Sequence, residues 1–213
     1  ANSGTISGGI ITGQVNNLDF GTITGGDFTG ATVADFGGTI TGGMFNGYTI
    51  ADGRLTITAS VVFSQDMLTD GVERIIVTGT GSIIGSDGAV AKRVEVQPGG
   101  AISGGEFTGE VYNDGTISGG TFDEQVTNGG EGTITGGTFT GEVVNEETIR
   151  GGVFYGTVTN WAPDSLIQGD GETTPTLNGE IVNELDFGSG TPRITFSLGE
   201  APTTAPISRR LAM

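Results

Sequence analysis

The sequence has no cysteine and no histidine, and each absence removes a class of chemistry. Without cysteine there is no disulfide framework, no thiol nucleophile and no thiolate ligand for a metal. Without histidine there is no Ser-His-Asp triad, no imidazole general base and no imidazole metal ligand. These absences leave oxygen-bearing side chains as the remaining candidates, and we expect no cofactor, no bound metal and no catalytic residue. Calcium at acidic turns such as Asp87-Gly88 and the loop at Asp170 is the alternative, although Asp-Gly and Gly-Asp are ordinary turn dipeptides and match no calcium-binding motif.

Basic residues and long apolar runs are also scarce. Eight Lys and Arg stand against 25 Asp and Glu, which gives a formal net charge of −17. Such a chain repels a phosphate backbone at long range, so nucleic acid is not an expected partner. No apolar run approaches the roughly 18 residues of a membrane-spanning helix, and the sequence predicts no membrane insertion.

Glycine is abundant, with 42 of 213 residues, whereas proline occurs six times. Glycine does not recur at every third position, which excludes collagen. Glycine and proline together stay below the roughly 25–30% that is typical of low-complexity disordered chains. The composition therefore favours an ordered structure in which glycine has a specific role.

One short unit occurs seven times. It begins with an isoleucine that is followed two and three residues later by Gly-Gly, and five residues later by a large apolar residue, which is phenylalanine in six copies. The isoleucines are Ile6, Ile23, Ile40, Ile102, Ile117, Ile134 and Ile149. An apolar residue closes each unit nine or ten positions after the isoleucine: Val15, Val33, Ile50, Val111, Val126, Val143 and Val158. Within each block, successive units are 15 or 17 residues apart.

This spacing predicts the geometry of the unit. Residues five apart on a straight strand point to opposite faces, yet the isoleucine and the phenylalanine should both be buried. A corner must therefore lie between them, and the Gly-Gly pair can form it through positive φ and close backbone approach. The sequence predicts an all-β fold, a parallel β-solenoid (β-helix) with 15–17-residue three-strand rungs. An antiparallel sandwich with regular hairpins is the alternative.

The repeats divide the chain into five segments. Solenoid repeats occupy 1–50 and 100–160, and the less regular 51–99 between them is expected to form irregular or wider β rungs, with an inserted subdomain as the alternative. Residues 161–198 are expected to form a loop and closing strands, because Val182–Gly188 nearly copies Val15–Gly21. Residues 199–213 are expected to form an extended tail. The handedness of the coil stays open.

Two units show a resemblance most clearly, Gly115–Phe122 and Gly132–Phe139. They resemble the glycine-rich parallel β-solenoid repeats of bacterial surface proteins and of phage fibres or spikes. The resemblance covers about 110 residues and implies an exposed structural or adhesive role. It carries over no catalytic residues, because the matching units contain none.

The isoleucine strands should present hydroxyl groups outward. Stacked rungs would align these side chains in two columns on one face, which is similar to the threonine arrays of ice-binding proteins. Alternatively, threonine is simply a good strand former that satisfies itself in a ladder. The candidate ligand-binding face consists of Thr5, Thr22, Thr24, Thr39, Thr41, Thr116, Thr133 and Thr135.

Carboxylates are the only acid–base groups present in quantity. Eight positions after the isoleucine, successive rungs carry Glu110, Gln125, Glu142 and Thr157, so acids alternate with neutral residues. This pattern avoids like-charge stacking at rung spacing and does not form a carboxylate cluster of the kind that glycoside hydrolysis requires. A polysaccharide-degrading enzyme is therefore the third hypothesis.

The first hypothesis is a non-enzymatic structural protein, a rigid solenoid on a virion surface or on an extracellular cell surface. The repeats begin by Gly4, which leaves no room for a signal peptide or an N-terminal cap, and an uncapped end is an open sheet edge. We therefore expect a homo-oligomer, a trimer or an end-to-end stack, within a larger assembly. Arg209 and Arg210 in the tail are the candidate anchor. The second hypothesis is an ice- or glycan-binding module that uses the threonine columns or Tyr112, Tyr155 and Trp161.

Overall fold

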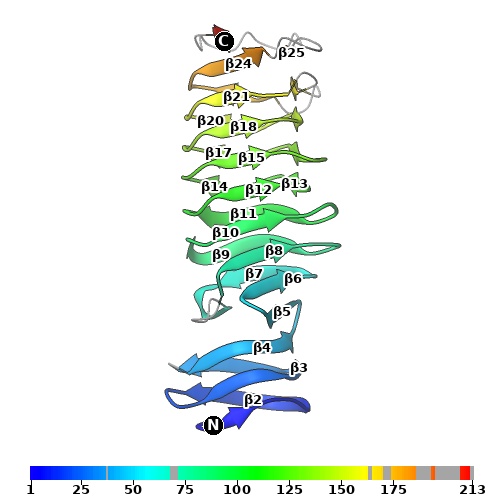
Figure 1. Ribbon diagram of the computed structural model, residues 1–213, viewed down its shortest axis with the longest axis vertical. Helices are drawn as coiled ribbons and strands as arrows, with labels where there is room; N and C mark the ends of the chain where they lie inside the picture. The colour runs from blue at the N-terminus through cyan, green and yellow to red at the C-terminus, as the bar shows by residue number, and fades with distance from the viewer. Residues whose placement is uncertain are drawn as a thin grey trace.

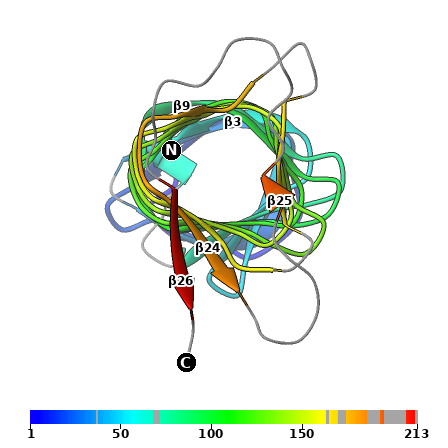
Figure 2. The ribbon, with the colours of Figure 1, turned by 90° about the horizontal axis from the view of Figure 1, so that it is seen from above.

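The computed structural model describes residues 1–36, 38–67, 72–162, 165–169, 174–185, 193–194 and 207–211. The described chain is an all-β rod of about nine turns in which parallel strands stack along one axis (Figure 1). The N-terminus lies at one end of the rod and the C-terminus at the other. Seen along the axis, most strands superpose in one ring, and the strands nearest the C-terminal end extend outward from it (Figure 2). The predicted parallel β-solenoid is therefore confirmed.

The N-terminal strands are β1 (Thr5–Ile6), β2 (Ile10–Leu18), β3 (Thr22–Phe36) and β4 (Thr39–Phe45). The central elements are β5 (Tyr48–Ala51), β6 (Arg54–Ile57), β7 (Ser60–Ser64), the single 3-10 turn η1 (Gln65–Met67), β8 (Arg74–Val77), β9 (Ser82–Val90) and β10 (Arg93–Val96).

Most of the C-terminal strands are shorter, with two or three residues each. They are β11 (Ala101–Phe107), β12 (Val111–Asn113), β13 (Thr116–Ile117), β14 (Thr121–Phe122), β15 (Val126–Asn128), β16 (Thr133–Ile134), β17 (Thr138–Phe139), β18 (Val143–Asn145), β19 (Thr148–Ile149), β20 (Val153–Phe154) and β21 (Val158–Asn160). The last five are β22 (Leu166–Ile167), β23 (Thr176–Leu177), β24 (Ile181–Leu185), β25 (Arg193–Ile194) and β26 (Ile207–Leu211).

The register places identical residues above one another. Ile117 pairs with Ile134, Phe122 with Phe139, and Val126 with Val143. All of these side chains are buried, and the phenylalanine rings from Phe107 to Phe154 stack with centroids 4.7–5.0 Å apart. Each apolar residue is thus covered by the rungs above and below it, which one rung alone could not achieve.

The two glycines of each corner have different roles. The first leaves room for the neighbouring rung, since a Cβ atom on Gly136 would run into the carbonyl oxygen of Ser118. The second adopts positive φ, 105° at Gly120 and 109° at Gly137, which L side chains rarely adopt. The predicted glycine corner is therefore confirmed, and one glycine could not serve both purposes.

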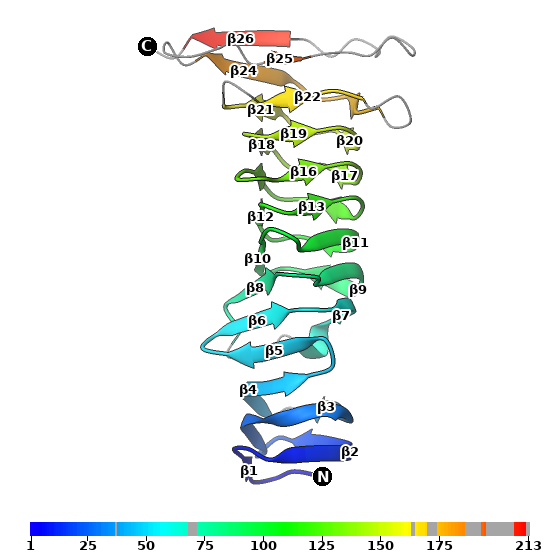
Figure 3. The same ribbon diagram turned by 90° about the vertical axis from the view of Figure 1, so that its right-hand side faces the viewer.

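The chain reverses direction where the N-terminal repeats end. Strand β5 is antiparallel to β4 and to β6, after which β6, β8, β10 and β12 stack in parallel (Figure 3). Ile50, which the sequence groups with Val15 and Val33, instead pairs with Gly43 in this reversal. That grouping is wrong, because the turn at Phe45–Tyr48 folds the chain back before a closing strand can form. The strands β6 to β10 nevertheless belong to the same stack as the repeats on either side of them.

The register near the C-terminal end also differs from the sequence similarity. Val182–Gly188 copies Val15–Gly21, which would place Val182 in the inward column. The structure instead pairs Ile181 with the buried Val158, and Asn183 with Asn160. The copied motif is therefore shifted by one residue, and its last three residues lie outside the described part of the chain.

Candidate binding surfaces

The predicted threonine columns exist, but each is short. In the N-terminal block Thr5, Thr22 and Thr39 stand in register. In the C-terminal block the column contains Thr116 and Thr133, followed by Thr148, and it ends at Ala101 on one side and Leu166 on the other. The antiparallel β5 and the central rungs separate the two blocks. The structure therefore offers two three-residue arrays instead of one continuous face.

The hydroxyls of the second column contact the backbone of the preceding rung. Thr24 donates to the Ile6 carbonyl at 3.5 Å, and Thr135 donates to the Ile117 carbonyl at 3.4 Å. Thr41 is exposed at the equivalent position of its rung. In Thr24 and Thr135 the donor capacity of the hydroxyl is used inside the protein.

A buried asparagine ladder, which the sequence analysis missed, lies at one corner of the C-terminal rungs. Asn113 donates to Asn128 at 2.7 Å, Asn128 to Asn145 at 2.9 Å, and Asn145 to Asn160 at 3.0 Å. All four side chains are fully buried. In each of these rungs an asparagine follows the closing valine by two residues, in the pattern Val-x-Asn. This repeated pattern is the sequence signal that could have revealed the ladder. Its role is structural, because the amides satisfy one another and nearby carbonyls.

A carboxylate with a shifted pKa lies beside this ladder. Burial raises the pKa of the Asp114 carboxyl, while a hydrogen bond from the Tyr112 hydroxyl lowers it and the charge of Glu131 raises it. Burial also raises the pKa of Tyr112, with further contributions from Asp114 and Glu146. Asp114 Oδ1 is buried without a hydrogen-bond partner. No group of three or more His, Cys, Asp or Glu residues suited to a metal ion occurs in the described chain.

A groove of about 310 Å³ opens on the side of the rod near its C-terminal end. Its floor is formed by outward residues of β18, β21 and β24, namely Val144, Thr159 and Val182, and the last two are only 8% exposed. Glu142 and Glu180 line the groove, as does Trp161, whose side chain is 55% exposed. Glu142 accepts hydrogen bonds from Thr159 at 3.2 Å and from Gln125 at 3.0 Å. Trp161 was predicted from the sequence as a candidate glycan-binding residue, whereas its proximity to Glu142 and Glu180 was not.

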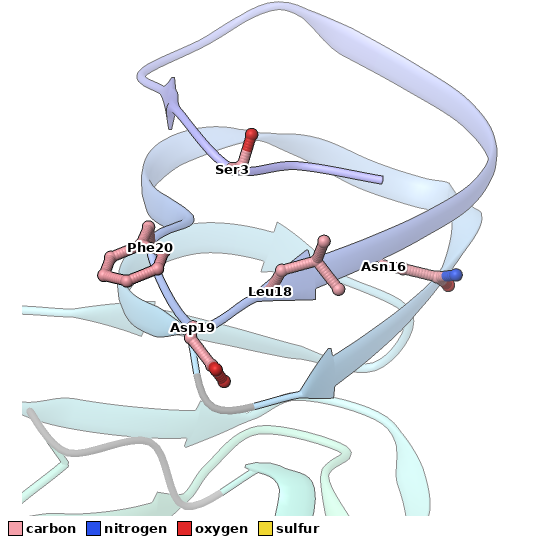
Figure 4. A pocket seen from close by; sticks show the side chains of 5 residues that line it. All are labelled: Ser3, Asn16, Leu18, Asp19 and Phe20. Atoms are coloured by element: carbon pink, nitrogen blue, oxygen red, sulfur yellow. The ribbon is translucent and has the colours of Figure 1, made fainter.

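The N-terminal end of the rod carries a second, more apolar hollow of about 600 Å³ (Figure 4). It is lined by Ser3, Asn16, Leu18, Asp19 and Phe20. The Phe20 side chain is 86% exposed, and Ile10 in the same rung is 83% exposed. Ile10 is an outward residue, since it stands in register with Asp27 and, one rung further, with the exposed Met44.

The tail residues Arg209 and Arg210 belong to β26, which pairs in parallel with β24. Their side chains lie outside the described part of the structure. The backbone of this segment therefore adds a strand to the sheet. Whether the two arginines anchor the protein stays a prediction.

Comparison of the chain with protein-family models, with curated proteins and with solved structures finds no match. The expected likeness to bacterial surface and phage proteins therefore rests on the shared solenoid architecture alone. No helix among the described residues is long and apolar enough to span a membrane.

Proposed function

We propose that the protein is a non-enzymatic structural rod, displayed on a virion or cell surface, that self-associates and mediates assembly or attachment. The observation that carries the proposal is that the buried side chains connect neighbouring rungs. Nearly every buried side chain belongs to an Ile, Phe, Val or Asn ladder that holds one rung to the next. Such a stack is a stiff spacer whose length is set by the number of its rungs.

Two exposed apolar side chains support self-association. Ile10 and Phe20 are large apolar residues, and each is more than four-fifths exposed. Covering such side chains with another chain removes apolar surface from water, which favours association. A second copy of the chain is the partner that we propose.

Native mass by light scattering, together with negative-stain images, tests the proposal. We expect particles heavier than the 21.5 kDa monomer that appear as rods. An antibody raised against the rod should label the surface of intact virions or cells of the source. A monomer at all concentrations, or antigen found only in the interior of cells, would contradict the proposal.

A second candidate function, glycan binding, is favoured by the groove at Trp161. Sugar rings pack on exposed aromatic faces, and their hydroxyls can donate hydrogen bonds to carboxylates such as Glu142 and Glu180. The net charge of −17 favours a neutral glycan over an acidic one. Trp161→Ala should abolish binding on an array of neutral glycans. Tyr155, which the sequence also suggested for this module, has a similar exposure but does not line the groove, so Tyr155→Ala should leave binding unchanged.

A further inference from the structure

One column of outward side chains changes its charge along the rod. Its members directly precede the inward apolar residues of β6, β8, β10, β12, β15, β18, β21 and β24, which stand in register. In order along the axis, this charged column is Arg54, Arg74, Arg93, Glu110, Gln125, Glu142, Thr157 and Glu180. It spans seven steps of about 4.8 Å, or about 34 Å. Three successive arginines therefore occupy one half, and three glutamates separated by neutral residues occupy the other.

The arginine half is unfavourable within one chain. Like charges directly opposite each other on neighbouring strands destabilise a sheet, and the acidic half avoids this by alternation. Glu95 offsets part of the repulsion, because it lies 3.1 Å from Arg74 and 3.3 Å from Arg93. Arg54 is exposed and forms no ion pair with any described carboxylate. A chain with only eight basic residues thus places three of them in consecutive rungs of one column.

We propose that two copies of the chain pack side by side in antiparallel orientation through the charged column. A two-fold axis parallel to the strands inverts the order of the rungs and lays the column on its own copy. Arg54 then faces Glu180, and Arg93 faces Glu142. Arg74 faces Thr157, and Glu110 faces Gln125. Each arrangement occurs twice, which gives four ion pairs and no pair of like charges.

A second copy of the chain complements more of the charges in the column than an anionic or a cationic partner would. An anionic polymer would explain the three arginines but not the acidic half, which would repel it. A cationic partner would explain only the acidic half. Self-pairing uses both halves, and every residue of the column has a complementary or neutral position opposite it.

This inference names one partner and one surface for the self-association in the proposed function, and it rests on that function. The test uses two double variants of the full chain, Arg54→Glu/Arg93→Glu and Glu142→Arg/Glu180→Arg. Each should shift the light-scattering mass from twice the chain mass to 21.5 kDa, because like charges then face each other. An equimolar mixture should recover the doubled mass, since the two variants restore all four ion pairs with each other. Glu106→Arg/Glu131→Arg, which makes the same charge change at exposed positions outside the column, should leave the mass doubled.

Salt provides a second readout on the unmodified protein. At 1 M salt the Debye length is about 3 Å, so the dimer should dissociate at least tenfold more readily than at 0.1 M. Circular dichroism of each variant verifies that the solenoid remains folded.

Three results would overturn the inference. If the unmodified chain self-associates but both double variants do so equally well, the column is not the interface, although the proposed structural function stands. If the unmodified chain is monomeric at every concentration, the interface and the self-association both fail. If it is monomeric but binds dextran sulfate through Arg54 and Arg93, the column serves an anionic polymer instead of a second copy.

Discussion

At the scale of the residue, Asn128 shows how a polar side chain can be part of a core. Its amide donates to Asn145 and to the Gly132 carbonyl at 3.2 Å, and its oxygen accepts from Asn113. In a fully buried site each of these groups would be costly if it were left unpaired. The main contribution of the ladder to stability is therefore that no buried amide at the corner is left without a hydrogen-bond partner.

Asn128→Ala should destabilise the solenoid by about 1–3 kcal/mol for each buried group that loses its partner. The measurement is the midpoint of denaturant unfolding, with Thr127→Ala as the control. Thr127 belongs to the same strand but lies on its outward side, so its removal should cost much less. Equal costs for the two variants would show that the ladder has no special role.

Asp114 predicts a dependence of stability on pH. Its pKa in the folded protein is raised above the ordinary value of 3.8, so ionisation is less favourable in the folded state than in the unfolded state. The raised pKa therefore lowers stability as the pH rises from below 3.8 through the folded pKa, and the loss persists at neutral pH. Asp114→Asn should raise the melting temperature slightly at pH 7 and leave it unchanged near pH 3. A difference of the same size at both pH values would mean that the charge of Asp114 is not its cause.

At the scale of the element, most of the rung could be predicted from the sequence. The offsets of the isoleucine, the phenylalanine and the glycine pair define a corner between two buried residues, and the structure has that corner. Asparagine was missed because it is usually a turn residue on the surface, and only the stacking of rungs buries it. The reversal at β5 was missed because Ile50 has the same spacing from Ile40 as Val33 has from Ile23. The charged column was missed because it can be seen only once the register of the strands is known. Three of its members lie in the less regular segment 51–99, whose strands cannot be aligned with the repeats from the sequence alone.

Gly137→Ala tests the second glycine of the corner. The substitution places a Cβ atom 3.2 Å from the Phe122 and Phe139 rings at a φ of +109°, so it should cost more than about 1 kcal/mol. Gly85→Ala is the matched control, because no atom lies within 4 Å of a Cβ placed there. Thermal unfolding of both variants measures the difference. A Gly137→Ala protein as stable as the control would show that the corner tolerates side chains.

At the scale of the whole molecule, the rod is a sum of contacts between neighbouring rungs. Apart from the reversal at β5, long-range order arises because each rung pairs in parallel with the previous one, with no other domain to organise it among the described residues. Removing one complete rung should therefore leave an intact, shorter solenoid.

Deletion of residues 116–132 tests this expectation. It joins Gly115 to Thr133, so that Phe107 can stack on Phe139 and Asn113 can donate to Asn145. The variant should keep the circular dichroism spectrum of the full chain and be shorter by about 4.8 Å in solution scattering. Deletion of residues 116–123 instead mismatches the ladders and should abolish folding. A shortened variant that unfolds would show that the stability of the rod is not additive over its rungs.

The equal step between rungs also fixes the axial spacing of the groups on the surface of the rod. Each inward position is fixed by its ladder, whereas the outward positions of the same strands are free to carry charge, hydroxyl or aromatic groups. Two outward groups n rungs apart are thus separated along the axis by about n times 4.8 Å, whatever their chemical nature. A partner that binds two such outward groups therefore recognises the distance between them along the rod as well as the identity of the residues.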